Sequence, residues 1–439
     1  MSKSEILVTV LLDGCKFEYS KYFRFNKYGR SLRLISKIAE PIGFEGIPPA
    51  LWSGAYPEDS DIFTIFGFKI NSPLRNLSFL HRISQSFKKR TPRRLRFLHK
   101  IIDQVVIKLC LKLLVPTQMC RGYERSNNIL IDITNFLNPK RGYASLFDIP
   151  HYFLKYFWFY EDKIPISRDY LRPNLFEMLR KEKKNYVYMQ NPVFNFSTRN
   201  RARIKQIYRK VEGLKGGRCD FACLSIATLD ELGHIFGPDN RILEDTAKRI
   251  DEVLFNIWGI LIKSYEKVTM IAHGDHGMVK VNKHVNLWAK LNQLQAKMEK
   301  DFIVFLNSSM AQFWFFNESS KVEISELLGS LECGRILTER DYEKYKMRFK
   351  DNKYGDLFWL ADPGTLIYPN FFGWYIPVRG MHGYVPECED NMGLLAVITN
   401  RDIKFKNNQN FNMVDIFPTI CEIMNLPVPL GAGESMIAR

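Results

Sequence analysis

The sequence predicts an α/β protein with a doubly wound, mostly parallel central sheet and helices on both faces of that sheet. Three observations predict this class. Residues 6–12 form a nearly continuous apolar run, as expected of a parallel strand that is buried on both faces. Residues 223–226 and 268–272 form two further apolar runs, and residues 241–265 between them repeat apolar side chains at helical spacing. Strands that alternate with helices in this way are typical of a doubly wound sheet.

Each of these three strands leads into residues that can bind a metal ion. Asp13 closes the first strand, and the pair Asp275 and His276 follows the third between two glycines. The second strand is followed by Asp230 and His234, which share one face if a helix begins there, since they stand four positions apart. Carboxylates and imidazoles are ligands of zinc and similar divalent ions. Open α/β sheets bind their ligands at the carboxyl ends of the strands, where these side chains are expected.

A sixth candidate stands late in the chain. His382 lies between Met381 and Gly383 in the run Gly-Met-His-Gly-Tyr. Any single His or Asp in a loop is more often an ordinary structural residue than a ligand. Three carboxylates and three imidazoles at the ends of successive strands are, however, enough to bind two ions.

The order of these motifs resembles the type I phosphodiesterase and nucleotide pyrophosphatase family of the alkaline phosphatase superfamily. The matching motifs are Asp13-Gly14, Ser53-Gly54-Ala55-Tyr56-Pro57-Glu58, Asp230 to Pro238, Asp275 to Met278, His382 to Tyr384, and the closing segment 414–427. The resemblance implies an alkaline-phosphatase-like fold and a phosphate-ester substrate. It also implies that Asp230, His234 and His382 hold one divalent ion and that Asp13, Asp275 and His276 hold the other. Zinc is the expected metal, with manganese or magnesium as alternatives.

The position of the nucleophile departs from the family pattern. Family members carry a Thr or Ser ahead of their Thr-Gly motif, but residues 43–49 contain no hydroxyl group, and Phe44 or Glu45 stands in its place. Three explanations stay open. A water activated by a metal ion attacks directly, with Glu45 as an extra ligand or general base. Alternatively, Ser53 or Cys15 replaces the nucleophile. In the third case the chemistry has been lost, and the chain is a metal-stabilised binding or assembly protein.

The function predicted from these motifs is the metal-dependent hydrolysis of phosphoric esters. We expect a diester, or an activated phosphate linked to a nucleotide, lipid or glycan, because no arginine can be placed beside the nucleophile to grip a simple monoester. No Cys or Ser stands in the Cys-x-Pro-x-Arg context of a sulfatase.

A strongly basic segment spans residues 82–114. Between residues 81 and 112 ten Lys and Arg residues face a single acid, Asp103, and from Leu95 onward apolar residues recur at steps of three and four. A basic amphipathic helix of this kind binds an anionic membrane surface. An ordinary core-facing helix with a solvated basic side explains the pattern equally well. No recognition motif accompanies the charge, which argues against nucleic acid as a partner.

The composition and the order of the motifs predict the location and organisation of the chain. Residues 1–5 do not resemble a signal peptide, no apolar stretch is long enough to span a membrane, and the eight cysteines form no close-spaced framework. We therefore expect a cytoplasmic protein, peripheral at the membrane if the basic helix binds there. No motif indicates an oligomeric state. The motifs predict a catalytic core in three parts, at residues 1–80, 196–282 and 376–439. The first part is expected to contain a helix at 29–40 and a loop that carries Glu45 and Ser53. A basic and aromatic-rich helical insertion (81–195) and a smaller α+β cap (283–375) separate the three parts.

Overall fold

In the computed structural model of the protein, the described residues are 5–43, 47–64, 66–72, 75, 140–141, 144–145, 155–159, 173–189, 201–214, 219–370 and 377–438. The chain divides into two compact units. The larger comprises Met1–Phe63, Tyr170–Arg348 and Leu357–Arg439, and the smaller comprises Thr64–Asp169 and Phe349–Asp356. All six predicted metal ligands belong to the larger unit.

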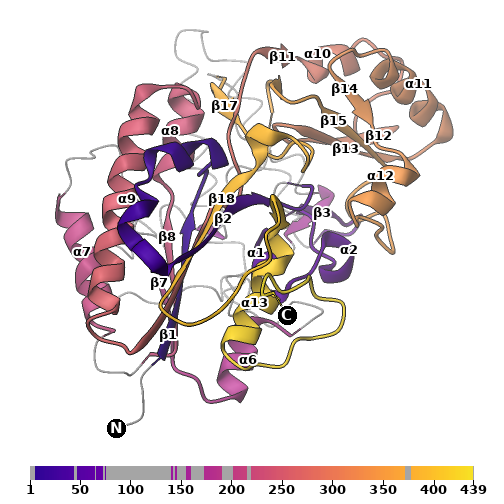
Figure 1. Ribbon diagram of the computed structural model, residues 1–439. Coiled ribbons are helices and arrows are strands. Elements are labelled where there is room, and N and C mark those ends of the chain that lie inside the picture. Colours follow the sequence, from indigo (N-terminus) through magenta and orange to yellow (C-terminus); the bar gives the residue numbers. More distant parts are fainter. Residues whose placement is uncertain are drawn as a thin grey trace, which may run out of the picture. The chain divides into compact units, whose positions relative to one another are not determined.

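A seven-stranded sheet forms the centre of the larger unit, in the strand order β19-β2-β18-β9-β1-β8-β7 (Figure 1). Its strands are β1 (Glu5–Leu12), β2 (Leu32–Ala39), β7 (Tyr186–Met189), β8 (Phe221–Ile226), β9 (Lys267–His273), β18 (Gly393–Thr399) and β19 (Asn410–Asn412). β1 pairs in parallel with both β8 and β9, and β18 runs antiparallel to its neighbours β9 and β2. The prediction of a mostly parallel sheet is therefore confirmed.

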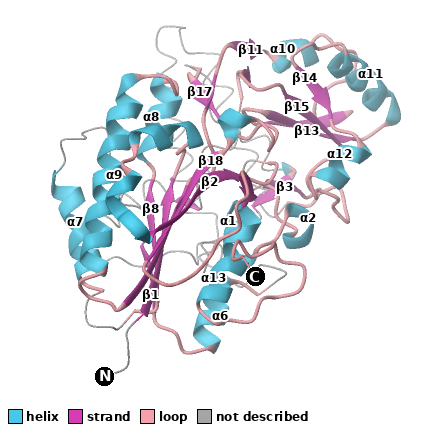
Figure 2. Ribbon diagram, in the orientation of Figure 1, coloured by secondary structure: helices cyan, strands magenta, loops and turns pink. Residues whose placement is uncertain are grey.

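Helices cover both faces of this sheet, as Figure 2 shows by the cyan ribbons on either side of the magenta strands. One face carries α7 (Arg201–Glu212), α8 (Thr228–Phe236) and α9 (Arg241–Leu261), and the other carries α1 (Ile47–Ser53), α6 (Leu175–Lys181) and α13 (Ile416–Ile423). Successive side chains of a strand point to opposite faces. Accordingly Val8 of β1 packs with the first set of helices and Leu7 with the second. The predicted doubly wound arrangement is confirmed.

Shorter helical segments complete the core: η1 (Phe17–Tyr22), η2 (Phe25–Ser31), α2 (Pro57–Ser60), η7 (Glu389–Asn391) and η8 (Met413–Asp415). The prediction of a helix at residues 29–40 is wrong, because these residues form the end of η2 and strand β2. In β2 the buried residues Leu34, Ser36 and Ile38 alternate with more exposed ones, and this period of two is that of a strand. Ser53, expected in a loop, is the last residue of α1. Residues 175–189, expected in the insertion, supply α6 and β7 to the core.

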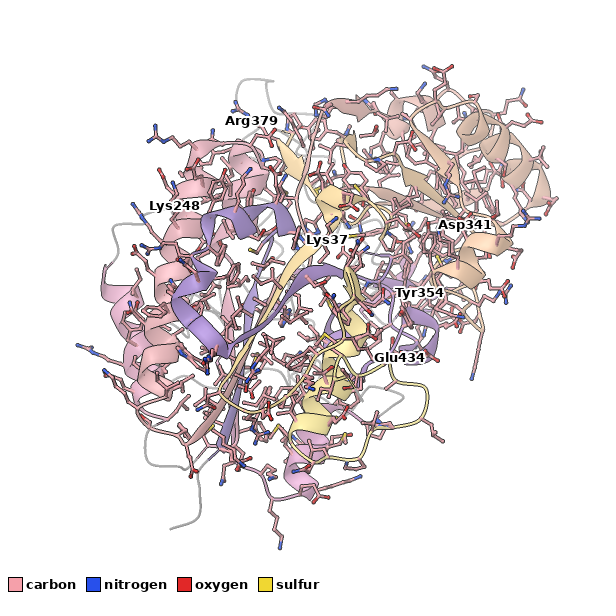
Figure 3. The ribbon with its side chains drawn as sticks, viewed as in Figure 1. Lys37, Lys248, Asp341, Tyr354, Arg379 and Glu434 are labelled. Atoms are coloured by element: carbon pink, nitrogen blue, oxygen red, sulfur yellow. The ribbon has the colours of Figure 1, made fainter. Side chains whose placement is uncertain are left out.

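A second, antiparallel sheet lies in the later part of the larger unit, in the order β12-β13-β15-β14. Its elements are β12 (Phe302–Leu306), β13 (Met310–Phe315), β14 (Gly334–Ile336) and β15 (Leu357–Ala361), with α10 (Leu287–Leu291), α11 (Glu318–Gly329) and α12 (Glu339–Lys344). Trp314 and Trp359 are fully buried in it. Asp341, labelled in Figure 3, accepts hydrogen bonds of 2.7 and 2.8 Å from Arg335 and caps α12. We call this α+β part the cap.

Two short ladders stand, along the chain, between the strands of the central sheet and those of the cap. β10 (Val279–Lys280) pairs with β17 (Gly380–Met381), and β11 (Lys283–Val285) pairs with β16 (Thr365–Ile367). The first of these ladders joins the segment that follows the loop after β9 to the segment that leads into His382.

The smaller unit is described only in short pieces. β3 (Phe66–Phe68) pairs with β6 (Phe157–Phe159), which belongs to the aromatic part of the predicted insertion, and β4 (Lys140–Arg141) pairs with β5 (Ala144–Ser145). The predicted basic helix at 82–114 lies outside the described residues. Within the described part of the chain, no helix combines the length and the apolar character that a membrane span requires.

Candidate metal centre

The end of β1 fixes two of the candidate ligands relative to each other. The backbone N–H of Asp13 donates to the carbonyl of Ile226 at the end of β8 (2.9 Å), and the N–H of Asp230 donates to the carbonyl of Asp13 (3.1 Å). Gly14 has a φ of +69°, and a Cβ at this position would stand 2.6 Å from the Cα of Asp230. Only glycine allows so close an approach, so the sequence Asp-Gly lets the first turn of α8 pack directly against the end of β1.

Asp230 and His234 lie on one face of α8, as the spacing of four residues predicted. The Nε2 atom of His234 is 3.1 Å from Oδ1 of Asp230. The other ring nitrogen, Nδ1, is 2.8 Å from the carbonyl oxygen of Gly380. A carbonyl can only accept a hydrogen bond, so Nδ1 donates to it, and Nε2 is the ring nitrogen that faces Asp230 and is available to a ligand. Metal-binding histidines are commonly oriented in this way.

The loop after β9 supplies Asp275 and His276. Oδ1 of Asp275 accepts hydrogen bonds from the N–H groups of Gly14 (3.2 Å) and His276 (3.0 Å). Nδ1 of His276 is 2.7 Å from the carbonyl oxygen of Gly277, which again leaves Nε2 for a ligand. That Nε2 atom is 3.4 Å from Oδ1 of Asp13 and 3.6 Å from Oδ1 of Asp275.

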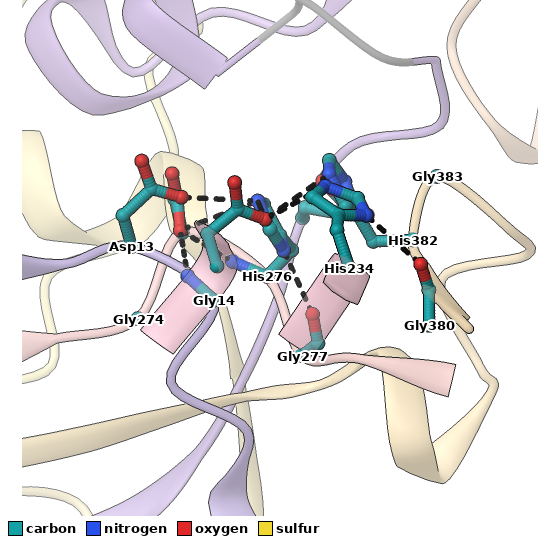
Figure 4. A network of polar contacts seen from close by, with 12 residues as sticks. Asp13, Gly14, His234, Gly274, His276, Gly277, Gly380, His382 and Gly383 are labelled. Carbon is teal, nitrogen blue, oxygen red and sulfur yellow. Dashed lines mark hydrogen bonds and ion pairs between the residues drawn. The ribbon is translucent and has the colours of Figure 1, made fainter. Parts of the chain in front are cut away.

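His382 enters the cluster from the segment after β17. Its ring stacks on that of His276 with 3.4 Å between centroids and 5° between planes, and its Nε2 atom is 3.6 Å from Oδ1 of Asp230. Figure 4 shows His276 between Asp13 on one side and the pair of His234 and His382 on the other. The residues come from four separate stretches of the chain that meet at the carboxyl ends of β1, β8 and β9.

The six predicted side chains therefore lie together, in two overlapping groups. Ligand atoms of Asp230, His276 and His382 all lie within 4.8 Å of one another, and so do those of Asp13, Asp275 and His276. His276 belongs to both groups, and His234 joins the first through its contact with Asp230. The family resemblance assigned His276 to one ion only.

Burial and the charges of neighbouring groups shift the pKa values of the clustered side chains. Burial, together with the charges of Asp275 and Asp230, raises the pKa of Asp13 well above its usual value. Burial opposes ionisation of Asp230 as well, but the neighbouring charges, that of His234 above all, outweigh it and hold the pKa of Asp230 below its usual value. The pKa of His276 is raised despite its burial, because Asp275 and Asp13 favour the imidazolium.

Burial and the charge of His276 lower the pKa of His382, so the cluster does not favour protonation of every ring. One oxygen atom of the cluster lacks a hydrogen-bond partner in the described part of the chain. Oδ1 of Asp230 is buried and accepts no well-formed hydrogen bond from the described residues, yet the Nε2 atoms of three histidines lie 3.1 to 3.9 Å away. Buried acceptors normally have a partner. A divalent cation among these atoms would satisfy the carboxylate and the imidazole lone pairs together, with release of protons from the histidines. The residues present therefore fit a metal ion.

The three residues considered for the attack on phosphorus do not join the cluster of ligands in the described part of the structure. Glu45 lies outside the described residues. Ser53 is 1% exposed at the end of α1, and its hydroxyl makes no hydrogen bond to any described residue. Cys15 is fully buried in the core, where burial and the charge of Asp275 raise the pKa of its thiol far above the usual value. A thiol of this kind is a poor nucleophile, because only the thiolate attacks.

Two residues beside the cluster were not predicted. Glu40, which directly follows β2, is 2% exposed, and Asn391 is 1% exposed. Each stands in a segment without a recognisable motif. At Glu40 the sequence shows only a Glu that precedes a proline, which does not indicate burial beside a metal centre.

A cluster of carboxylates and imidazoles at the carboxyl edge of a doubly wound sheet is the arrangement of metal-assisted phosphohydrolases. The fold and the site thus define a phosphoric ester hydrolase of the alkaline phosphatase superfamily. The chain belongs to the type I phosphodiesterase / nucleotide pyrophosphatase family, whose sequence profile matches residues 141–385, more than half of its 439 residues.

Solved structures agree on the fold. Murine ectonucleotide pyrophosphatase / phosphodiesterase 5 is 14% identical, with a TM-score of 0.63, and the match covers 99% of this chain and 100% of that one. The human protein of the same name matches at 14% identity with a TM-score of 0.61 and the same coverage. An inactive variant of the murine protein in complex with AMP matches at 13% identity with a TM-score of 0.61, covering 99% and 100% of the two chains. At these identities the likeness shows the shared fold and does not identify a substrate.

Proposed function

We propose that this phosphodiesterase-family protein hydrolyses a phosphoric diester, or an activated phosphate linked to a nucleotide, lipid or glycan, with two divalent ions held by Asp13, Asp230, His234, Asp275, His276 and His382. The observation that carries the proposal is the gathering of these six side chains into two overlapping groups of ligand atoms, each within 4.8 Å. Zinc suits this mixture of carboxylates and imidazoles, with manganese or magnesium as the alternatives.

Divalent ions in such a site stabilise the negative charge on the phosphoryl oxygens and acidify the attacking water. The chain itself holds the ligands in place. Asp275 is fixed by the N–H of Gly14, and the rings of His234 and His276 are turned by the carbonyls of Gly380 and Gly277. Because these groups are set before the substrate arrives, little reorganisation accompanies the reaction.

The charges around the site favour a diester over a monoester. Among the described residues, no Lys or Arg forms an ion pair with Asp13, Asp230 or Asp275, whose ion-pair partners are histidines. A phosphomonoester carries a second negative charge that would require further cationic groups. A diester carries one negative charge, which the bound ions can balance.

The attacking group in this proposal is water. Its oxygen bonds to phosphorus, the bond from phosphorus to the leaving oxygen breaks, and the proton of the water passes to a general base. Phe44 or Glu45 stands at the position of the family's hydroxyl nucleophile in the sequence, and Glu45 is the candidate for this base because its side chain can accept a proton. Replacement of Glu45 by Gln should abolish most of the turnover while two ions stay bound. Retained activity would exclude Glu45 as the base.

A second candidate function is binding without turnover. It is favoured by one observation, the lack of any Ser or Thr between residues 43 and 49. A metal-stabilised binding or assembly protein would keep its bound ions and its fold but would release no product.

One assay distinguishes the two. The purified protein, supplied with zinc or manganese, is given a bis-aryl phosphodiester, and release of the phenolate is followed by absorbance. The enzyme should release it, the Asp275→Ala variant should not, and Asp245→Ala, which removes an exposed carboxylate from α9, should match the wild type. A wild type that binds two ions but is inert with every metal would support the binding function instead.

A further inference from the structure

Glu40 is a buried carboxylate that the proposed chemistry does not use. It directly follows β2, only 2% of its surface is exposed, and its Oε1 atom accepts a hydrogen bond of 2.7 Å from Nδ2 of Asn391. Its second oxygen, Oε2, is buried and makes no hydrogen bond to any described residue. Because burying a carboxylate is costly unless its charge is compensated, this position calls for a role.

Asn391, the partner of Glu40, contacts both histidine-bearing loops of the metal centre. Its backbone carbonyl accepts a hydrogen bond of 2.7 Å from the N–H of Gly277, the residue after His276. Its side-chain oxygen Oδ1 accepts one of 3.1 Å from the N–H of Gly383, the residue after His382. One buried side chain and its own backbone thus connect the end of β2 to the loops that carry two stacked ligands.

The backbone at Gly277 is closely packed against the segment that contains Asn391. A Cβ at this position would stand 2.2 Å from the carbonyl oxygen of Asp390, so the loop passes against the backbone of η7 with no room for a side chain. The next N–H, that of Met278, donates to the same carbonyl of Asp390 at 2.8 Å. The backbone after His276 is therefore held at two successive residues by the segment that contains Asn391.

We propose that Glu40 and Asn391 form a brace that positions the rings of His276 and His382 for metal binding. Both are positioning residues, and the inference rests on the metal centre proposed above. Carboxylates and amides that orient metal ligands in this way typically change the affinity for the metal by about 10- to 100-fold when they are removed.

Cobalt binding tests the brace, because the visible absorption of bound Co²⁺ reports the geometry of its ligands. The affinity for Co²⁺ and its spectrum are measured by titration for the wild type, for Glu40→Ala and Asn391→Ala, and for the double variant. We expect each single variant to bind Co²⁺ about 10- to 100-fold more weakly, with a changed spectrum. The double variant should be no weaker than the weaker single one, since either change alone breaks the brace.

Two further variants separate positioning from general loss of structure. Glu40→Gln keeps an oxygen that can accept from Asn391, so it should restore the wild-type spectrum and bind Co²⁺ more tightly than Glu40→Ala. Asp251→Asn is the matched control, because Asp251 is a carboxylate on α9 with 1% exposure and a 2.8 Å ion pair to Lys27. It should change neither affinity nor spectrum. Far-UV circular dichroism of the chelator-treated variants verifies that each is folded.

The possible failures are distinguishable. If the wild type binds no Co²⁺, both the proposed metal centre and the proposed brace are refuted. If the wild type binds two ions and Glu40→Ala binds them with the same affinity and spectrum, only the brace is refuted. Losses in the two single variants that add up in the double variant would also refute it, because they would show that Glu40 and Asn391 act independently.

Discussion

Replacement of Asp230 by Asn should remove one of the two ions. Oδ1 of Asp230 is the point on which the Nε2 atoms of His234, His382 and His276 converge, at 3.1, 3.6 and 3.9 Å. Asn has the same shape but no charge, so the change tests the carboxylate itself. The second group, made of Asp13, Asp275 and His276, does not contain Asp230 and should keep its ion.

The size of the effect follows from these separations. Two unit charges about 3.5 Å apart at an effective dielectric constant of about 20 attract each other by about 5 kcal/mol. The amide oxygen of Asn remains a weak ligand, and water screens part of the loss. If about half of the attraction is lost, the free energy of metal binding weakens by about 2.5 kcal/mol, which corresponds to an affinity about 70-fold lower.

The measurement is the metal content of the dialysed protein together with a competition titration against a chelator. We expect two ions for the wild type and one for Asp230→Asn. Glu231→Gln, which removes the same charge one residue further along α8, should keep both. An Asp230→Asn variant that binds two ions with wild-type affinity would show that Asp230 is not a ligand.

Two predictions concern stability. Burial raises the pKa of the Glu40 carboxyl to about 7 in the folded, chelator-treated protein. The folded state therefore binds the Glu40 proton more tightly than the unfolded state does. The resulting stability is fully present below the usual pKa of a Glu and is lost as the pH rises through about 7. Glu40→Gln should therefore stabilise the chelator-treated protein against urea at about pH 8 by on the order of 3 kcal/mol, and much less at about pH 5; equal effects at the two pH values would contradict this. Gly277→Ala would place a Cβ 2.2 Å from the carbonyl oxygen of Asp390; it should lower the stability by about 1–3 kcal/mol in thermal unfolding. Gly259→Ala on α9, where nothing lies within 4 Å of the added Cβ, should be neutral or stabilising, and the same loss in both variants would refute the steric argument.

The sequence was most informative where chemistry and periodicity coincide. Asp230 and His234 could be placed on one helical face because their spacing of four is fixed by the helix itself, and the structure has them 3.1 Å apart. Asp13 could be placed at the edge of the sheet because an apolar run buried on both faces ends there. Strand ends of a parallel sheet meet at one edge, so local patterns were enough to predict a distant meeting of residues.

Other features could not be predicted because their causes are not local. The expected helix at residues 29–40 is replaced over Leu32–Ala39 by strand β2, which is fixed by its pairing with the distant strands β18 and β19. Asn391 is about 350 residues from Glu40 along the chain, and nothing in either segment indicates that the two meet. The sharing of His276 between both ligand groups likewise depends on side-chain positions in space. Glu45 stays a prediction, since it lies outside the described residues.

The most direct test of the metal centre is anomalous X-ray diffraction at the zinc absorption edge, on crystals of the protein grown with zinc. We predict two anomalous peaks, one in contact with Asp230 and His382 and one in contact with Asp13 and Asp275, with His276 next to both. Crystals that show no peak among these side chains, or only peaks elsewhere on the molecule, would contradict the account.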